Sequence, residues 1–575
     1  MAAHKLRGWL VATTLLFAAC LGLSAVKAQL PQDAVSAFVP DPEPSAGAAA
    51  LLSRVGITQG QPTAVGAYLK RPVFLDRIFV DRQFEGFRFA DNLTEAETLF
   101  IPPDPIGAAG HSRVIAVVNS MIEARNKGGA LQWRAGLPSF FAPLSGTLGC
   151  FTDPDCLITD PKIVYDERED RFVVVTLHFV IGTASVSPTN VSRILLAVSK
   201  DGNPRGPTSA DWHFLAINAK QVIPRRVAPP PTPLVPFDHW ADYPGFEVDE
   251  DAVYITANMF TFVPYGSFGG VRLWIVAKGA GTGGFYDGGL GTVTVHNPYA
   301  GGGLAATTMP ALVQGPGGAG PSVGTYLVSS GIFNISTGIE SVQVVRVDDP
   351  LGRAGGPSFV RTLVPVGDIE TPSALPGAPQ FGSPVTINTN DKRALDAVWQ
   401  NDRLWITSTI RPNAGPDLNQ ATAHWFELDT SNGMVTLVQQ GNIGGEDIAP
   451  GTHTFFPSVA VNRFGAVAFG FSASAPTIYA GAFVTGRSPF DAPGTVRQSE
   501  LVHAGLAPYV RTFGGGRNRW GDYSGIALDP SNDDFYWVFN QYADTPGDVL
   551  EPPFPPEDGR WGTAWARVRF VGGGN

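Results

Sequence analysis

The stretch DYPGFEVDEDAVYITANMF, residues Asp242 to Phe260, decides the fold. It starts with acidic and aromatic residues and continues into a run of strand-forming residues. A short acidic turn follows, and then a second run of strand formers. Two such runs joined by a tight polar turn predict a β-hairpin.

Similar units recur along the chain at intervals of tens of residues. Each places apolar, β-branched or aromatic residues on both sides of a polar or glycine-containing turn. The units begin at Asp104, Asp160, Leu395, Phe456 and Asp522. Recurrence of this kind indicates a repeat architecture, and an all-β chain built from such repeats closes most naturally as a β-propeller. Counting hairpins predicts an all-β fold of about seven four-stranded blades.

The composition agrees with this fold class and excludes some partners. A ring of blades can use all 575 residues as one unit, because each blade packs only on its neighbours. The 67 glycines and 49 prolines disfavour helices, and the 36 phenylalanines and 12 tryptophans suit packing between sheets. The formal net charge of -11 argues against a nucleic-acid partner, which needs a basic surface.

The first 28 residues have the pattern of a secretory signal peptide. Lys5 and Arg7 precede an apolar run over 9–23, and the small-residue site at 26–28 fits cleavage. We therefore expect a secreted or periplasmic protein. A lipoprotein signal ending at Cys20 is the less favoured alternative, because the residue three positions before it is not leucine. No later stretch is long and apolar enough to span a membrane.

Three further segments complete the predicted organisation. Residues 29–98 form a leader rich in proline, alanine and glycine. At its end, residues 73–100 alternate apolar and charged residues, which predicts a strand that would complete the last blade and close the ring. Residues 99–575 are the predicted propeller domain. Cys150 and Cys156 flank a turn-rich loop, and in an oxidising compartment we expect them to pair as a disulfide.

Three motifs together resemble a family of secreted bacterial proteins, largely uncharacterised, with a propeller-like domain. They are PPDPIGAAG (102–110), DYPGFEVDEDAVYITANMF (242–260) and RWGDYSGIALDP (519–530). The resemblance spans about residues 104–570. It implies the propeller fold and export, and it implies no particular activity.

Acidic residues stand at the start of the predicted inner strands. The repeat register places Asp104, Asp160, Asp242 and Asp522 at equivalent positions, with Phe456 in the sixth blade. Carboxylates that converge on one axis raise each other's pKa or recruit a cation, and calcium is the natural candidate for such ligands. The simpler alternative is that each aspartate caps a turn by accepting backbone N–H bonds.

Two clusters of similar residue types precede two of these strands. They consist of His239, Trp240, Asp242 and Tyr243 in one cluster and Arg519, Trp520, Asp522 and Tyr523 in the other. Indole and phenol faces stack on sugar rings, and arginine and aspartate bind hydroxyl or acidic groups. The alternative is that Trp240 and Trp520 wedge between blades while the polar groups satisfy buried backbone.

The same residues offer catalytic roles. His239 would serve as a general base and Tyr523 as an acid or nucleophile. Asp242 and Asp522 would supply the carboxyl pair of a glycosidase. His453, just before the sixth inner strand, would face the same channel mouth, although a lone histidine is more often structural.

The sequence therefore leaves three hypotheses for function. The first is a propeller that binds an extracellular glycan or protein at its channel mouth. The second is a glycan-active hydrolase or lyase that uses the Asp242 and Asp522 clusters. The third is a structural or adhesive surface protein with the leader as a tether. No nucleophile elbow, zinc-protease motif or P-loop occurs in the chain.

Overall fold

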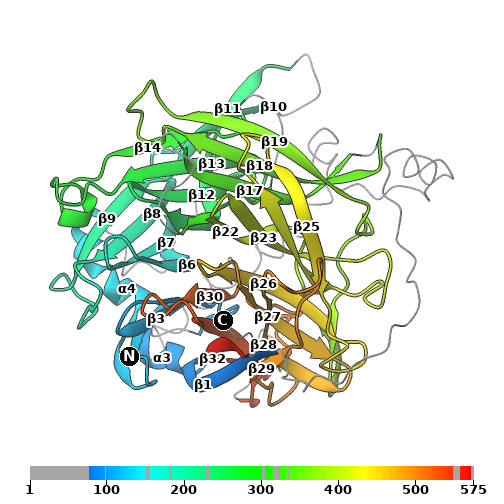
Figure 1. Cartoon of the computed structure of the whole chain (residues 1–575). Coiled ribbons are helices and arrows are strands. Elements are labelled where there is room, and N and C mark those ends of the chain that lie inside the picture. Colours follow the sequence, from blue (N-terminus) through cyan, green and yellow to red (C-terminus); the bar gives the residue numbers. More distant parts are fainter. Residues whose placement is uncertain are drawn as a thin grey trace.

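The chain folds as a seven-bladed β-propeller (Figure 1). The computed structural model describes residues 77–96, 99–148, 156–180, 184–226, 232–300, 306–314, 323–334, 336–547 and 557–571. The predicted signal peptide, most of the leader and Cys150 lie outside these residues, so export and the pairing of Cys150 with Cys156 stay predictions. No helix of the described residues is long and apolar enough to cross a membrane.

The first three blades follow the chain in order, each from its innermost to its outermost strand. Blade 1 consists of β2 (Ile106–Ala109), β3 (Arg113–Val118), β4 (Met121–Asn126) and β5 (Leu131–Gly136). Blade 2 consists of β6 (Cys156–Asp166), β7 (Arg171–Val180), β8 (Val191–Ser199) and β9 (Trp212–Asn218). Blade 3 consists of β11 (Leu234–Val248), β12 (Ala252–Thr261), β13 (Phe268–Ala277) and β14 (Val293–His296), with β10 (Gln221–Arg226) added on the inner side of β11.

Blades 4 and 5 share an inner segment. Blade 4 consists of β15 (Met309–Pro310), β17 (Val323–Asn334), β18 (Ile339–Asp348) and β19 (Ser358–Gly367). Directly after β15, β16 (Leu312–Val313) pairs in parallel with the inner strand of blade 5. Blade 5 continues with β22 (Ala394–Gln400), β23 (Arg403–Ile410), β24 (Thr422–Asp429) and β25 (Thr436–Ile443).

The last two blades complete the ring. Blade 6 consists of β26 (His453–Val461), β27 (Val467–Ala475), β28 (Ile478–Arg487) and β29 (Glu500–His503). Blade 7 consists of β30 (Gly525–Leu528), β31 (Phe535–Asp544), β32 (Arg560–Val571) and, outermost, β1 (Arg77–Arg88). Because β1 comes from the N-terminal side and β32 from the C-terminal side of the chain, their pairing joins the two ends of the propeller.

The inner strands surround the axis in sequence order. β2 contacts β30 on one side and β6 on the other, β6 contacts β11, and β11 contacts β15 and β16. β22 contacts both β16 and β26, and β26 contacts β30. This closed chain of neighbours confirms the propeller and excludes a stacked sandwich.

The second strands of the blades are buried on both faces because a blade packs on each side. In β7, the run from Phe172 to Phe179 is buried without interruption, and it consists mostly of the β-branched, aromatic and aliphatic residues that favour strands. Apolar clusters fill the spaces between neighbouring blades, for example Ile115, Phe172 and Trp212 between blades 1 and 2.

Few residues are helical, and one insertion contacts the loop that leads to β30. The helices are short: α3 (Asp91–Glu95), α4 (Leu137–Phe140), α5 (Ser145–Leu148) and the 3-10 turns η2 (Ala142–Leu144) and η3 (Phe285–Asp287). Between blades 4 and 5 the chain forms a small hairpin of β20 (Ala378–Gln380) and β21 (Ser383–Ile387). Gln380 exchanges hydrogen bonds with the backbone of Tyr509, in the loop that leads to β30.

Candidate channel mouth

Four inner strands or their approaches carry the same backbone feature. Asp104, Asp160, Tyr243 and Phe456 each adopt a left-handed φ, of 47°, 53°, 53° and 52°, and each directly precedes a proline. Such values are uncommon for residues other than glycine, and for Tyr and Phe they are outliers. The pairing register of β6, β11 and β26 shifts at these positions. In β6, β11 and β26 these bulges lie within the strand, and Asp104 lies just before β2.

The bulges correct the predicted register. Tyr243, not Asp242, is the structural equivalent of Asp104 and Asp160, and Asp242 lies one residue earlier, before the bulge. The sequence register had aligned the first residue of each acidic motif rather than the residue before the proline. Asp242 therefore reaches the mouth from a different backbone position than Asp104 and Asp160.

Hydrogen bonds tie the acidic residues of blades 1, 2 and 7 together. The carboxylate of Asp104 accepts the backbone N–H of Asp522 at 2.7 Å and the side-chain amide of Asn119 at 2.8 Å. The amide oxygen of Asn119 accepts the backbone N–H of Asp160 at 2.8 Å. The carboxylate of Asp160 in turn accepts the backbone N–H of Tyr243 at 3.2 Å. Asp104 and Asp160 thus accept backbone N–H groups of other blades, whereas the capping alternative placed such bonds within each local turn.

Two tyrosines lie across the axis below these carboxylates. The hydroxyl of Tyr523 donates to the carbonyl oxygen of Pro161 at 3.0 Å, and that of Tyr243 donates to the carbonyl oxygen of Asp522 at 3.1 Å. Their rings meet edge to face with centroids 5.9 Å apart, and both side chains are buried. Together they form a floor that separates the channel mouth from the channel below.

Three arginines complete the mouth. The guanidinium of Arg393 lies 4.2 Å from the ring centre of Tyr243 and binds Asp391 through two hydrogen bonds of 2.6 and 2.8 Å. Arg519 donates to the carboxylate of Asp522 at 3.1 Å. Arg517 lies 3.9 Å from the same carboxylate. Arg393, Arg519 and Asp522 are all partly exposed, so the mouth presents positive and negative groups to solvent.

The grouping of carboxyl groups changes their acidity. Burial, with the nearby Asp160 adding to it, raises the pKa of Asp242 to about 8, while Arg393 opposes the shift. Burial also raises the pKa of Asp104 and of Asp160, and in both cases Asp522 contributes to the increase. Asp242 is therefore mostly protonated at neutral pH, and it can donate a proton or a hydrogen bond.

The predicted calcium site finds no support. Among the described residues, no group of three or more His, Cys, Asp or Glu side chains is arranged to hold a metal ion. Asp104, Asp160, Asp242 and Asp522 are all described, and their environment explains the result. The carboxylates of Asp104, Asp160 and Asp522 accept hydrogen bonds from backbone N–H groups, a side-chain amide or an arginine, which occupy oxygen atoms that a cation would need.

The other predicted site residues lie away from the mouth. Trp240 is buried and stacks on Phe179 with ring centres 4.7 Å apart, and Trp520 is buried against Tyr509. Neither leaves a face for a sugar ring, which agrees with the structural alternative. His239 is fully buried, its Nδ1 donates to the carbonyl oxygen of Phe237, and burial lowers its pKa to about 4.

His453 also stands apart from the acidic residues. Its Nδ1 accepts the backbone N–H of Ala421 at 3.3 Å, and burial lowers its pKa to about 4. Sequence reasoning missed Asn119, Asp391, Arg393 and Arg517. The charged run from Asp391 to Arg393 directly before the inner strand of blade 5 was the signal that could have found two of them.

The fold and the mouth define this chain as a seven-bladed β-propeller with a charged axial opening. No family model matches the chain, and no curated protein matches it. The resemblance to the secreted bacterial family therefore stays a prediction.

Solved structures show distant similarity. A Trypanosoma rangeli sialidase in complex with sialic acid aligns with 11% identity and a TM-score of 0.31, over 72% of this chain and 54% of that chain. An N-acetylgalactosamine deacetylase from F. plautii, in complex with blood group B trisaccharide, aligns with 11% identity and a TM-score of 0.30, over 82% and 89%. A protein of unknown function from Dyadobacter fermentans aligns with 13% identity and a TM-score of 0.25, over 61% and 98%.

The chain thus spans about half the length of the sialidase that it matches. Identities and TM-scores this low carry no argument about the ligand or reaction of this chain.

Proposed function

We propose that this protein is an exported propeller that binds an extracellular glycan at its channel mouth. The observation that carries the proposal is the gathering of Asp160, Asp242, Asp522, Arg393 and Arg519, from blades 2, 3, 5 and 7, around one partly exposed opening. A sugar hydroxyl both donates and accepts hydrogen bonds. A surface that alternates carboxylates with guanidinium groups offers partners for both roles.

The mouth is also preorganised for binding. Arg393 is held by two hydrogen bonds to Asp391 and by the ring of Tyr243, and the carboxylate of Asp522 is held by Arg519. Side chains fixed in this way lose little conformational freedom when a ligand arrives. Binding loops on a rigid propeller are the usual location of such sites.

A glycan array with the mature protein tests the proposal. We expect Arg393→Gln to weaken binding by about tenfold or more, which corresponds to the loss of one charged hydrogen bond. The matched control is Arg346→Gln. Arg346 likewise forms two hydrogen bonds to an aspartate two residues away, Asp348, but lies on blade 4 away from the axis. Equal binding by both variants, or capture of proteins but of no glycan, would contradict the proposal.

A second candidate function is glycan hydrolysis or elimination. The raised pKa of Asp242, caused by burial and by Asp160, supports it because a general acid must hold its proton at working pH. If the protein turns over a polysaccharide, we expect activity to fall as pH rises through about 8 and Asp242→Asn to lose it. Unchanged turnover by Asp242→Asn would remove this residue from any catalytic role.

A further inference from the structure

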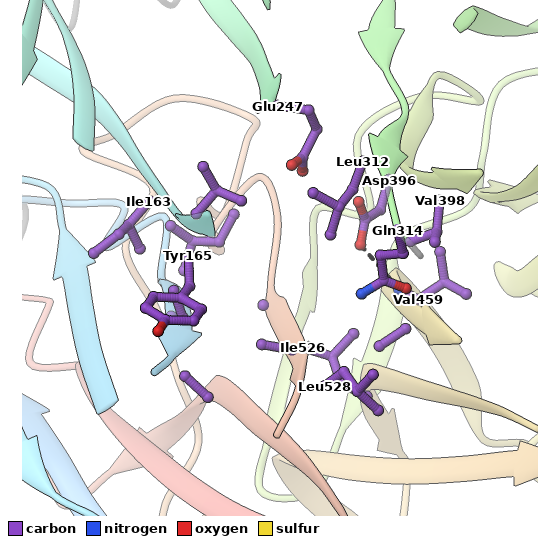
Figure 2. A pocket seen from close by; sticks show the side chains of 18 of the residues that line it. Ile163, Tyr165, Glu247, Leu312, Gln314, Asp396, Val398, Val459, Ile526 and Leu528 are labelled. Carbon is purple, nitrogen blue, oxygen red and sulfur yellow. Dashed lines mark hydrogen bonds between the residues drawn. The ribbon is translucent and has the colours of Figure 1, made fainter. Parts of the chain in front are cut away.

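Below the tyrosine floor, the axis holds a narrow chamber. Its volume is about 20 Å³, and Lys162, Glu247, Met309, Asp396 and Tyr523 are among the residues that line it. The chamber shares Glu247 and Asp396 with a longer cavity of about 60 Å³. This second cavity runs between the inner strands of the blades as far as Tyr165 and the exposed Glu167 (Figure 2). The chamber is thus reached from the face opposite the charged mouth.

Lys162 is buried in this chamber without an oxygen partner. Its side chain stands on β6, two residues after the bulge at Asp160, and the residue is only 4% exposed. Its Nζ contacts the thioether sulfur of Met309 at 3.8 Å and faces the ring of Tyr523 at 4.5 Å. Among the described residues no carboxylate or carbonyl oxygen lies within hydrogen-bond distance of Nζ. Buried lysines are rare unless they are paired, because burial of an unpaired charge costs free energy. Lys162 is therefore a candidate functional residue.

Two carboxyl groups share the cavity with this amine. Figure 2 shows the side chains of Glu247 and Asp396 pointing into the longer cavity from β11 and β22, and both residues also line the chamber. The carboxylate of Asp396 accepts the backbone N–H of Val459 and of Ala397, each at 2.9 Å. Oε2 of Glu247 is buried and has no hydrogen-bond partner among the described residues.

Burial shifts all three groups toward their neutral forms. It raises the pKa of Glu247, raises that of Asp396 to about 6, and lowers the pKa of Lys162. These directions favour the uncharged amine and the protonated acid that imine formation uses.

We propose that Lys162 is a covalent binding site for a small carbonyl compound, an aldehyde or a ketone, that enters along the axial cavity. The Nζ lone pair forms a bond to the carbonyl carbon, and the carbonyl oxygen takes up the proton that nitrogen loses. Glu247 then donates a proton to the resulting hydroxyl group, which leaves as water. Nitrogen gives up its remaining proton to the Glu247 carboxylate, so an imine and one water form without any oxidant or reductant.

The chamber selects against other ligands for this amine. A charged ligand would lose its hydration in this buried space, and a large ligand would not pass between the packed inner strands. A neutral, compact carbonyl compound avoids both costs. The site is independent of the glycan proposal, because the floor formed by Tyr243 and Tyr523 separates it from the mouth.

Reductive trapping tests the proposal in the intact protein. The folded chain is treated at neutral pH with glycolaldehyde and sodium cyanoborohydride, which reduces an imine to a stable hydroxyethyl amine, and is then mapped by peptide mass spectrometry. We expect Lys162 to be labelled at least tenfold faster than the exposed Lys200, because exposed amines are largely protonated at this pH. In urea-unfolded protein, the two lysines should be labelled equally.

Two variants sharpen the result. Glu247→Gln keeps the shape of the side chain but removes its acid, so Lys162 should be labelled several-fold more slowly while Lys200 is unchanged. Lys162→Met should lose the fast-labelled site altogether. Labelling of Lys162 in folded wild-type protein that is no faster than that of Lys200 would overturn the proposal, and this comparison does not depend on whether any variant folds.

Discussion

The hydroxyl of Tyr243 donates a hydrogen bond of 3.1 Å to the backbone carbonyl oxygen of Asp522, 279 residues further along the chain. Tyr523 directly follows Asp522, and its hydroxyl donates a hydrogen bond of 3.0 Å to the carbonyl oxygen of Pro161. Blades 2, 3 and 7 are therefore linked across the axis by two buried phenols. Pro161 is buried and Asp522 is partly buried, so each link stabilises the ring at its centre.

These links predict a stability effect at the axis. Tyr523→Phe leaves the buried carbonyl oxygen of Pro161 without its partner and should lower the free energy of unfolding by about 1–3 kcal/mol. Tyr243→Phe removes a bond to the partly buried carbonyl oxygen of Asp522 and should lower it by about 0.5–1.5 kcal/mol. Urea unfolding followed by tryptophan fluorescence measures the change. Tyr479→Phe is the control, because Tyr479 is part-exposed, its ring contacts Phe381, and its hydroxyl makes no hydrogen bond to any residue that the structure describes. Unchanged stability of both axial variants would show that these two hydrogen bonds do not contribute to the free energy of unfolding.

The acidity of Asp242 predicts a pH dependence of stability. Burial, with Asp160, raises its folded-state pKa from 3.8 to about 8. The folded state therefore binds this proton more tightly than the unfolded state, and the resulting stability is fully present below about pH 4 and lost as pH rises through about 8. We expect the free energy of unfolding to decrease between these values and Asp242→Asn to flatten the decrease.

Glu340 provides the comparison for that experiment. Burial, with Glu370 nearby, raises its pKa to about 8 as well, and Glu340 lies on β18 in blade 4. Glu340→Gln should also reduce the decrease of the free energy of unfolding with pH, independently of Asp242→Asn. A profile that Asp242→Asn leaves unchanged would mean that Asp242 is ionised in the folded state at neutral pH.

The seven-blade count was predictable because hairpins are local. Each unit carries its own strand formers and turn residues, so the pattern around Asp242 to Phe260 is readable without knowledge of the rest of the chain. The inner strand of blade 4 was missed for the opposite reason. It is split into Met309–Pro310 and Leu312–Val313, which pair with different sheets, and pieces of two residues leave no periodicity to detect.

The candidate site was predictable only in part. The acidic motifs placed Asp104, Asp160 and Asp522 near the axis, but the register of Asp242 depends on a bulge whose signal is the following proline, not the aspartate. Trp240 was assigned to binding because indole rings suit sugars, yet the space between blades takes large aromatic side chains equally well. Lys162 went unnoticed, since burial of a charged side chain inside a channel cannot be read from its neighbours in the sequence.

The ring closure predicts a second stability effect. The side-chain oxygen of Thr563, on β32, accepts the backbone N–H of Phe87 at 2.7 Å and donates to its carbonyl oxygen at 3.0 Å. Thr563→Val keeps the side-chain shape but leaves both backbone groups of β1 unpaired, and it should cost about 1–3 kcal/mol and loosen β1. Thr436→Val, on an exposed position of β25, should change stability by less than about 0.5 kcal/mol.

Limited proteolysis shows whether the effect concerns β1. In Thr563→Val, cleavage should begin within residues 77–88 at protease concentrations that leave the wild-type protein intact, while the other blades resist. If cleavage starts elsewhere, or if the two threonine variants have equal melting temperatures, the side chain of Thr563 does not stabilise the pairing of β1 with β32.

A buried ion pair between blades 2 and 3 gives the sharpest contrast with a surface pair. Nζ of Lys278 lies 2.5 Å from the carboxylate of Asp166, which also accepts the hydroxyl of Tyr286 at 2.9 Å, and both charged side chains are almost fully buried. Lys278→Met leaves the carboxylate of Asp166 buried with no cation, so it should destabilise the fold by about 3–5 kcal/mol. Arg353→Met breaks an exposed pair with Asp251 and should cost about 0–1 kcal/mol.

The double variant separates the ion pair from simple packing. Adding Asp166→Asn to Lys278→Met removes the uncompensated charge, so we expect it to restore part of the lost stability, whereas a packing defect would persist or worsen. Thermal unfolding is measured for the wild type, for Lys278→Met and Asp166→Asn alone, and for the double variant, which together form a double-mutant cycle. If Lys278→Met costs no more than Arg353→Met, the Lys278 and Asp166 charges are solvated in the folded protein and the packing between blades 2 and 3 does not depend on them.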